Sequence, residues 1–508
     1  MTTKKQSLTG KLIELVSTDR FFSTIVGLFI VQALWIALFS KYPMAFDEGY
    51  HYGVIKLYGE HLSPFWSGQP AGANEFGAIF RDPSYLYHYI LSFPYRLISL
   101  VTSSLAAQVI FLRLISIALF VWGLFIYKRL LHAMGASKSL SNILIFIFTL
   151  IPVTSMLAGQ INYDNLLIPI TGLLMLWTVN FISELRSKKT LNPWLLHKIV
   201  ALGLFGALVK YAFLPFFASA SIIIFAYILV SYRKRFKDFI RDFKTELQKV
   251  SFIKRWLVLV IILLLSFLAT ERYGLNYIRY QAFVPDCSQA MSVSQCSEFG
   301  PWIRDHNLAS RQINVDMPGP FSYLQHDWLY GMWFRLFFAL AGPTNNYQTK
   351  GPLTAPAWTF IALFIVGGLA VILYGFRVLA QNTYRVAIPL GLSLFYVLIL
   401  FANGYASFSE TGKPVAINGR YLLPVLLPIM AFGGIALVRL VRSDHVKVAL
   451  AILALVGMLA GGGVMTYILR SESSWYWTSS LIINVNSIVH DAFGPVTPGY
   501  DRATQYLH

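Results

Sequence analysis

The sequence predicts an all-helical protein that crosses a membrane many times. Of the 508 residues, 56% are hydrophobic and only 13% are charged, against roughly 25% charged residues in an ordinary soluble domain. Long apolar runs recur along the chain, and the loops between them are short and rich in lysine and arginine. The formal net charge is +18. We expect the lysines and arginines to lie in cytoplasmic loops and to contact anionic lipid headgroups. We therefore expect the lipid bilayer, and no nucleic acid, as a partner.

We predict about eleven transmembrane spans. They are 21–40, 109–127, 140–157, 166–182, two within 199–230, 256–270, 357–376, 386–401, one that ends at Arg439, and 448–467. The run 199–230 is too long for one span and has basic residues on both sides, so the chain must turn near Lys210 to Pro215. The basic N-terminal segment predicts a cytoplasmic N-terminus, and the composition predicts a multi-pass membrane protein.

Most of the remaining hydrophilic sequence lies in two loops predicted to be exoplasmic, 41–82 and 271–356. We therefore divide the chain into an N-terminal transmembrane module (1–270), an exoplasmic loop with interfacial helices (271–356), and a C-terminal transmembrane module with an exoplasmic tail (357–508). Interfacial helices are expected around 83–89, 233–241 and 327–335, where aromatic and polar residues alternate. The second loop holds Cys287 and Cys296, and either a disulfide or two reduced thiols fits their spacing.

The most informative stretch is Asp47-Glu48-Gly49-Tyr50-His51, which directly follows the first span. Ionisable groups at the membrane boundary are costly unless they are paired or used. Neighbouring residues on a helix point about 100° apart, so one carboxylate can act on a substrate while a partner holds the other. With Asp164 expected on the same face, the sequence predicts an outward-facing site with Asp47, Glu48 and Asp164 as catalytic candidates. The structural alternative is a solvated, acidic helix N-terminus.

His51 follows Asp47 by four residues, so helical spacing predicts that the two side chains are neighbours. Carboxylates and an imidazole can ligate a divalent metal ion, which makes Asp47, Asp164 and His51 candidate ligands. The alternative is a histidine that is simply hydrogen-bonded to a carboxylate. We expect no other cofactor, because the sequence lacks the common nucleotide-binding and zinc-protease motifs. His51, His88, Tyr87 and Tyr421 are candidate substrate-binding residues.

Several cations are predicted near the outer boundary, where the orientation rule disfavours them. Such residues need an anionic partner, and a phosphate at the headgroup level is one. Arg81, Lys210 and Arg420 are the candidates for binding it. The structural alternative is snorkelling to the headgroups or pairing with local carboxylates.

Five segments together resemble a known family. They are the acidic pair after the first span, the Pro83-Ser84-Tyr85-Leu86-Tyr87-His88-Tyr89 helix, Phe111-Leu112-Arg113-Leu114-Ile115-Ser116, the Asn162-Tyr163-Asp164 turn, and Gly419-Arg420-Tyr421-Leu422-Leu423-Pro424. The first three resemble the GT-C superfamily of membrane glycosyltransferases, which includes protein O-mannosyltransferases and the aminoarabinose transferases of lipid A. The last two resemble a related group of bacterial multi-pass membrane proteins without an assigned chemistry.

The resemblance implies a transferase that moves a hexose or pentose, usually with inversion, from a polyprenyl-phosphate donor to a lipid, glycan or protein acceptor outside the membrane. It implies that Asp47 deprotonates the acceptor hydroxyl, that Glu48 supports it, and that Asp164 orients the acceptor or helps hold a metal. Many relatives have Lys or His before Pro-Pro in the interfacial helix, where this chain has Arg81-Asp82-Pro83-Ser84. The phosphate-binding residue therefore stays open among Arg81, Lys210 and Arg420.

Other classes of function are compatible with many spans. A lipid or polysaccharide transporter or flippase would also carry acids and arginines near helix breaks, but these are expected near the midplane and in repeated halves. An O-antigen ligase or polymerase of another fold would share the donor without the acidic pair. A purely structural membrane protein explains the spans but not the polar residues at one surface.

Overall fold

The computed structural model describes residues 7–44, 47–188, 191–233, 236–311, 318–337, 354–381, 383–471 and 473–493. Within these ranges the chain is almost entirely helical, and its one extended pairing is an isolated antiparallel bridge between Ser40 and Tyr476. Residues 312–317 and 338–353 of the predicted second loop, and 494–508 of the predicted tail, lie outside the described residues. The predicted all-α membrane fold is confirmed.

Nine spans in the described part of the chain are long and apolar enough to cross a membrane. They are built on α2 (Asp19–Phe39), α5 (Leu105–Ala133), α8 (Asp164–Lys188), α10 (Leu214–Tyr232), α12 (Phe252–Ala269), α19 (Ala355–Gln381), α20 (Thr383–Thr411), α21 (Leu423–Leu440) and α22 (Asp444–Leu459). A tenth span is formed if α6 (Lys138–Thr149) and α7 (Pro152–Ala158), bent by 76°, are counted as one. The eleventh predicted segment, α9 (Pro193–Val209), is a shorter apolar helix, so length and composition alone support nine or ten spans.

The predicted turn within 199–230 is present. Helix α9 ends at Val209, Lys210 has an extended backbone, and a short 3-10 turn, η2 (Tyr211–Phe213), leads into α10. Pro215 lies in the first turn of α10, where a missing N–H costs nothing because that position has no intrahelical acceptor. The break places a lysine between two apolar helices.

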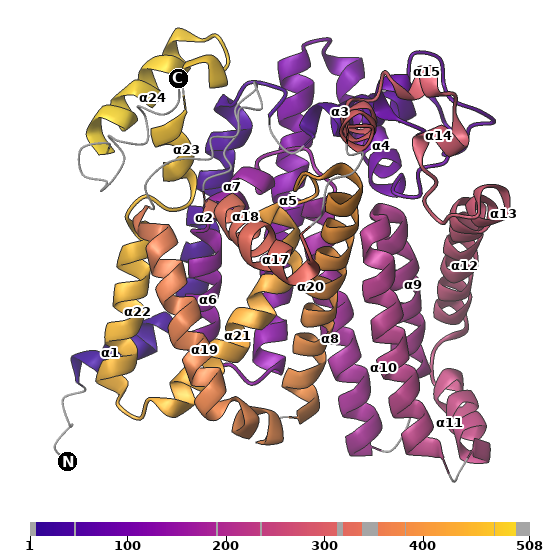
Figure 1. Cartoon of the computed structure of the whole chain (residues 1–508). Coiled ribbons are helices and arrows are strands. Elements are labelled where there is room, and N and C mark those ends of the chain that lie inside the picture. The colour runs from indigo at the N-terminus through magenta and orange to yellow at the C-terminus, as the bar shows by residue number, and fades with distance from the viewer. Residues whose placement is uncertain are drawn as a thin grey trace.

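The remaining helices are short and mostly lie at one end of the bundle (Figure 1). They are α1 (Leu8–Val16), α3 (Glu48–Glu60), η1 (Asn74–Phe76), α4 (Leu86–Val101), α11 (Phe236–Gln248), η3 (Thr270–Gly274), α13 (Leu275–Tyr280), α14 (Cys287–Ala290), α15 (Val293–Cys296), α16 (Gly300–Ala309), α17 (Pro320–Tyr323), η4 (Leu324–Trp328), α18 (Leu329–Phe337), η5 (Gly419–Leu422), α23 (Val464–Arg470), η6 (Ser473–Trp475) and α24 (Ser480–Phe493). Helices α4, α11 and α18 lie at the three predicted interfacial segments. Cys287 and Cys296 form a disulfide.

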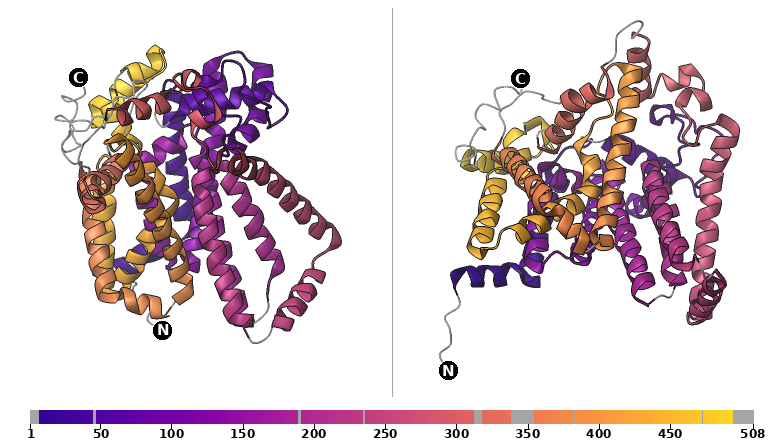
Figure 2. Two further views of the ribbon diagram at one scale, coloured as in Figure 1. Left: turned by 45° about the vertical axis from the view of Figure 1, so that its right-hand side comes forward. Right: turned by 60° about the horizontal axis from the view of Figure 1, so that its bottom comes forward.

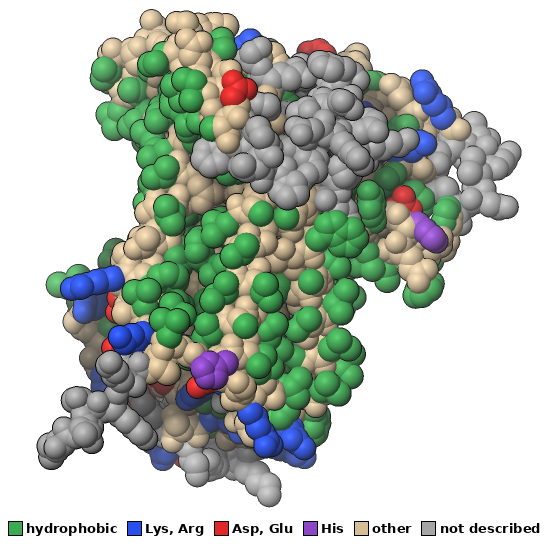
Figure 3. Space-filling model, turned by 90° about the vertical axis from the view of Figure 1, so that its left-hand side faces the viewer, with side chains coloured by type: hydrophobic (Ala, Val, Ile, Leu, Met, Phe, Trp, Pro, Cys, Tyr) green, Lys and Arg blue, Asp and Glu red, His purple; other side chains and the backbone are tan. Residues whose placement is uncertain are grey.

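The spans differ in how much of their surface the protein itself covers. Helix α8 is central, with 78% of its most apolar window buried, whereas α12 has only 6% of its window buried. Figure 2 shows α12 leaning away from the bundle, with α11 at its lower end. In Figure 3, hydrophobic side chains cover the middle of the molecule and lysines and arginines gather at its lower end. This distribution matches a protein surrounded by lipid at mid-height.

Candidate functional site

Four charged side chains from distant parts of the chain meet at the upper end of the bundle. Arg420 Nη2 donates to Asp47 Oδ2 at 2.9 Å, and Arg420 Nε lies 3.4 Å from Asp164 Oδ2. Lys210 Nζ donates to the other oxygen of Asp164 at 2.7 Å. We call this set, Asp47, Arg420, Asp164 and Lys210, the charge chain.

Breaks and ends of helices place all four residues. Asp47 precedes α3, Asp164 begins α8, Lys210 follows α9, and Arg420 lies in η5 before α21. The side-chain oxygen of Asn162 accepts from the Asp164 N–H at 2.9 Å, and the Asn418 oxygen accepts from the Arg420 N–H at 3.2 Å. Each asparagine thus satisfies a backbone donor that has no intrahelical acceptor.

The charge chain is neutral overall and opens to the surroundings at one member. Arg420, Asp164 and Lys210 are buried, whereas 64% of the Asp47 side chain is exposed. The Lys210 ammonium lies 4.5 Å from the ring centres of both Tyr163 and Tyr421, within the range of cation–π attraction. Three members of the charge chain are therefore enclosed by the protein. Asp47 is the member that a substrate can reach from outside.

The backbone at Asp47 is unusual. Its φ of 65° places it in the left-handed region, which costs a non-glycine residue about 1–3 kcal/mol unless its surroundings hold it there. Asp47 is therefore the N-cap residue of α3, and the chain turns into the helix at this position. Such conformations are concentrated at functional sites.

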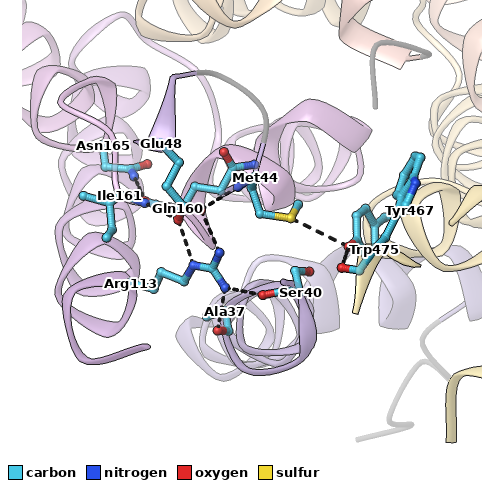
Figure 4. Close-up of polar contacts among 10 residues, drawn as sticks. All are labelled: Ala37, Ser40, Met44, Glu48, Arg113, Gln160, Ile161, Asn165, Tyr467 and Trp475. Atoms are coloured by element: carbon cyan, nitrogen blue, oxygen red, sulfur yellow. Dashed lines mark hydrogen bonds and ion pairs between the residues drawn. The ribbon is translucent and has the colours of Figure 1, made fainter. Parts of the chain in front are cut away.

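Glu48, the neighbour of Asp47, has a different environment (Figure 4). It is fully buried and binds Arg113 through two hydrogen bonds, from Nε at 2.8 Å and from Nη2 at 2.7 Å. The backbone N–H groups of Met44 and Ile161 also donate to its oxygens. Arg113 in turn donates to the carbonyls of Ala37 and Ser40. Glu48 thus joins the end of α2, the start of α3, α5 and the turn before α8.

This arrangement changes the role expected for Glu48. All its acceptor positions face donors inside the protein, so it is placed to position Asp47 and the 161–164 turn and not to contact a substrate. One acid of the pair is held by a partner while the other stays accessible. Arg113 is the signal in the sequence for such a partner, because it is a charge within an apolar run, where an unpaired cation would be costly.

His51 pairs with His88 and not with Asp47. His51 Nδ1 and His88 Nε2 are 2.8 Å apart, both rings are buried, and both contact Tyr163. Burial lowers the pKa of His51 well below its usual range and that of His88 to about 3, so both are neutral near pH 7. Asp47 is the N-cap residue of α3, with a left-handed backbone, and the His51 N–H donates to its carbonyl oxygen at 3.0 Å.

The proposed metal ligands do not form one donor set. Asp47 and Asp164 both face Arg420, while His51 faces His88. In the part of the chain that the structure describes, no group of three or more His, Cys, Asp or Glu side chains is placed to hold a metal ion. The oxygens of Asp47 and Asp164 face the cations Arg420 and Lys210, and the mechanism proposed for this site uses no metal ion.

Two further candidate residues, Arg81 and Tyr87, are not members of the charge chain. Arg81 forms an ion pair with Glu271 at 2.6 Å, and Glu271 also contacts Arg272, so Arg81 joins the start of the second loop and not the charge chain. Tyr87 is buried against His51 and Tyr163. Tyr421 does lie at the charge chain, with its ring also 5.2 Å from the Arg420 guanidinium carbon. Lys210 and Arg420 are therefore the two phosphate candidates that the structure brings together.

No protein-family model and no curated protein sequence matches the chain. Among solved structures, the chain is similar to the crystal structure of ArnT from Cupriavidus metallidurans bound to undecaprenyl phosphate. The TM-score is 0.47 and the sequence identity 12%, over 96% of this chain and 76% of that chain. At this identity the similarity assigns no activity to the chain.

Proposed function

We propose that the protein is a membrane glycosyltransferase that moves a sugar from a polyprenyl-phosphate donor to an acceptor hydroxyl on the exoplasmic face. The observation that carries the proposal is the charge chain: an exposed carboxylate, Asp47, pairs with the buried Arg420, which also lies against the buried Asp164 that Lys210 binds. This combination provides a base and a cationic seat for a phosphate within one site.

The donor phosphate would take the place of Asp47 on Arg420. The phosphodiester carries one negative charge, as the Asp47 carboxylate does, so it can take over the ion pair with Arg420 while Asp47 stays beside it as the base. The Asp47 carboxylate in its contact with Arg420 is 64% exposed, so water screens the ion pair and can solvate the carboxylate when the two separate. Binding of the donor would thus release Asp47 at low cost, next to the phosphate that replaced it.

The reaction is a single displacement. The acceptor oxygen forms a bond to the anomeric carbon while the bond from that carbon to the phosphate oxygen breaks, and the bonding electrons leave with the polyprenyl phosphate. Asp47 takes the proton of the acceptor hydroxyl. Attack from the side opposite the phosphate inverts the anomeric centre. Arg420 and Lys210 stabilise the negative charge that develops on the leaving phosphate, which is the kind of electrostatic term that often dominates catalysis.

The surroundings of the site support this assignment. Helix α3, which Asp47 caps, lies at the upper end of the molecule in Figure 1, and lysines and arginines gather at the lower end in Figure 3. We assign the lower end to the cytoplasmic face of a bacterial inner membrane. Outside the cell a lipid-linked donor replaces nucleotide sugars. The sugar can be a hexose or a pentose, and the acceptor a lipid, a glycan or a protein.

The test is sugar transfer by purified protein in vesicles that contain a polyprenyl-phosphate sugar. We expect Asp47→Asn to lower the transfer rate by about 10²–10⁴-fold, the typical contribution of a general base. The matched control is Glu60→Gln, which alters an exposed acid at the other end of α3 and should leave the rate unchanged. Transfer by Asp47→Asn at the wild-type rate would rule out Asp47 as the base. Movement of labelled lipid across the bilayer without any transfer by the wild type would favour the transporter.

A further inference from the structure

A second site lies at the opposite end of the molecule and is independent of the proposed transferase function. A cavity of about 340 Å³ is lined by the first turns of α9 and α12 and by the end of α11. Trp194, His197, Arg255 and Trp256 are the lining residues that can recognise a ligand. Its volume falls within the range of about 300–1,000 Å³ that is usual for small-molecule sites.

The cavity contains a cation without a protein partner. Within the described residues the Arg255 side chain makes no hydrogen bond or ion pair, and its Nε is buried. Two carboxylates on neighbouring elements are already engaged: Glu246 pairs with Lys249, and Glu184 accepts from Asn192. A half-buried guanidinium with no protein anion is costly unless an external anion compensates it.

The walls of the cavity indicate that the anion belongs to a lipid. Helix α12 has only 6% of its apolar window buried by the protein, so its sides face the acyl chains. Trp256 is 52% exposed, and tryptophans beside a cation are typical of the headgroup level of a bilayer. Further positive charge comes from Lys198, whose ammonium lies 5.2 Å from the Trp194 ring centre, on the same end of α9.

We infer that this cavity binds the phosphate headgroup of an anionic glycerophospholipid from the membrane leaflet at the basic end of the protein. Arg255 is the phosphate ligand, Trp194 and Trp256 flank the glycerol region, and the acyl chains lie along the open side of α12.

The test measures lipid binding to the full-length protein by native mass spectrometry in a neutral detergent. Phosphatidylglycerol and phosphatidylcholine with the same acyl chains are the probes, and we expect phosphatidylglycerol to bind more tightly. Arg255→Gln should weaken phosphatidylglycerol binding about tenfold, the usual effect of losing a hydrogen bond to a charged group. The matched control, Arg241→Gln, changes an arginine of α11 that is 69% exposed and paired with Asp238, and should bind like the wild type.

Three outcomes would overturn the inference. The first is equal affinity of the wild type for both lipids. The second is equal affinity of the wild type and Arg255→Gln for phosphatidylglycerol. The third is displacement of the lipid by soluble glycerol phosphate at the same concentration, which would indicate a site for the free anion. If Arg255→Gln does not fold, Arg255→Lys and Trp256→Ala replace it. The lysine variant should keep the preference for phosphatidylglycerol, and the alanine variant should bind both lipids more weakly.

Discussion

At the scale of single residues, the protein gives two adjacent carboxylates opposite environments. Asp47 is exposed and holds one hydrogen bond to Arg420, whereas Glu48 is fully buried and accepts four hydrogen bonds from two backbone groups and Arg113. The difference follows from the backbone, because the left-handed conformation of Asp47 turns its side chain away from the helix that Glu48 begins. The two residues should therefore differ sharply in what their replacement costs.

Replacement of Glu48 should affect stability more than replacement of Asp47. In Glu48→Gln the Arg113 charge stays buried without its counter-ion, which costs about 3–5 kcal/mol. Asp47→Asn removes a partly exposed pair and should cost about 0–1 kcal/mol. Thermal unfolding of the two variants in detergent measures the difference. The double variant Glu48→Gln with Arg113→Gln should regain part of the lost stability. An unfolding temperature of Glu48→Gln equal to that of the wild type would contradict the assigned pairing.

The His51–His88 pair predicts how stability depends on pH. Because the pKa of His88 is about 3 in the folded protein and 6.5 for an ordinary histidine, only the unfolded chain binds this proton between those values. The pKa of His51 is lowered too. Stability should therefore be greatest above about pH 6.5 and fall as the pH is lowered toward about 3.

The measurement is the unfolding temperature as a function of pH. Wild-type protein should lose stability more steeply on acidification than His88→Gln, which carries one fewer buried histidine. His61→Gln, at an exposed histidine in the predicted first exoplasmic loop, should keep the wild-type dependence of the unfolding temperature on pH. Equal slopes for the wild type and His88→Gln would show that the buried pair does not titrate as described.

At the scale of elements, the site depends on where helices end. Asp164, Lys210 and Arg420 each lie next to the end of a helix, so the site needs the breaks in the correct place. The segment that carries Arg420 is held by close packing: a Cβ at Gly419 would lie 2.7 Å from backbone atoms of Met332, Arg335 and Leu336 in α18. Glycine at 419 therefore fixes the approach of η5 to α18.

Gly419→Ala should displace Arg420 from Asp47 and Asp164. Backbone atoms cannot move aside as a flexible side chain can, so η5 or α18 must shift, and overpacking of this kind costs about 1–3 kcal/mol. We expect a lower unfolding temperature and weaker binding of polyprenyl phosphate. Gly391→Ala in α20 is the control, because nothing lies within 4 Å of the added Cβ and alanine is the better helix former. Wild-type carrier binding by Gly419→Ala would contradict this role of η5.

At the scale of the whole molecule, composition and apolar runs were sufficient to predict the helical membrane fold and the break at Lys210, because both follow from local sequence. The structure also brings together Asp47, Asp164, Lys210 and Arg420, which the sequence indicated through charges at the ends of apolar runs. Sequence spacing could not predict the pairing of Glu48 with Arg113 or of His51 with His88. These contacts join separate helices, and helical periodicity relates only residues within one helix.

The same limit explains why the sequence did not indicate the partners of two further candidate residues. Arg81 pairs with Glu271, 190 residues further along the chain, and no local pattern indicates such a partner. His51 forms its side-chain hydrogen bond with His88, 37 residues further along the chain, and helical spacing does not indicate that partner either.

The central claim is that the donor phosphate replaces the Asp47 carboxylate on Arg420, and the affinity of the protein for polyprenyl phosphate tests it most directly. We predict that Asp47→Asn binds the lipid as tightly as the wild type or more tightly, because a competing anion is removed. Arg420→Gln should bind it about tenfold or more weakly. Equal weakening by both substitutions, or no weakening by Arg420→Gln, would contradict the account.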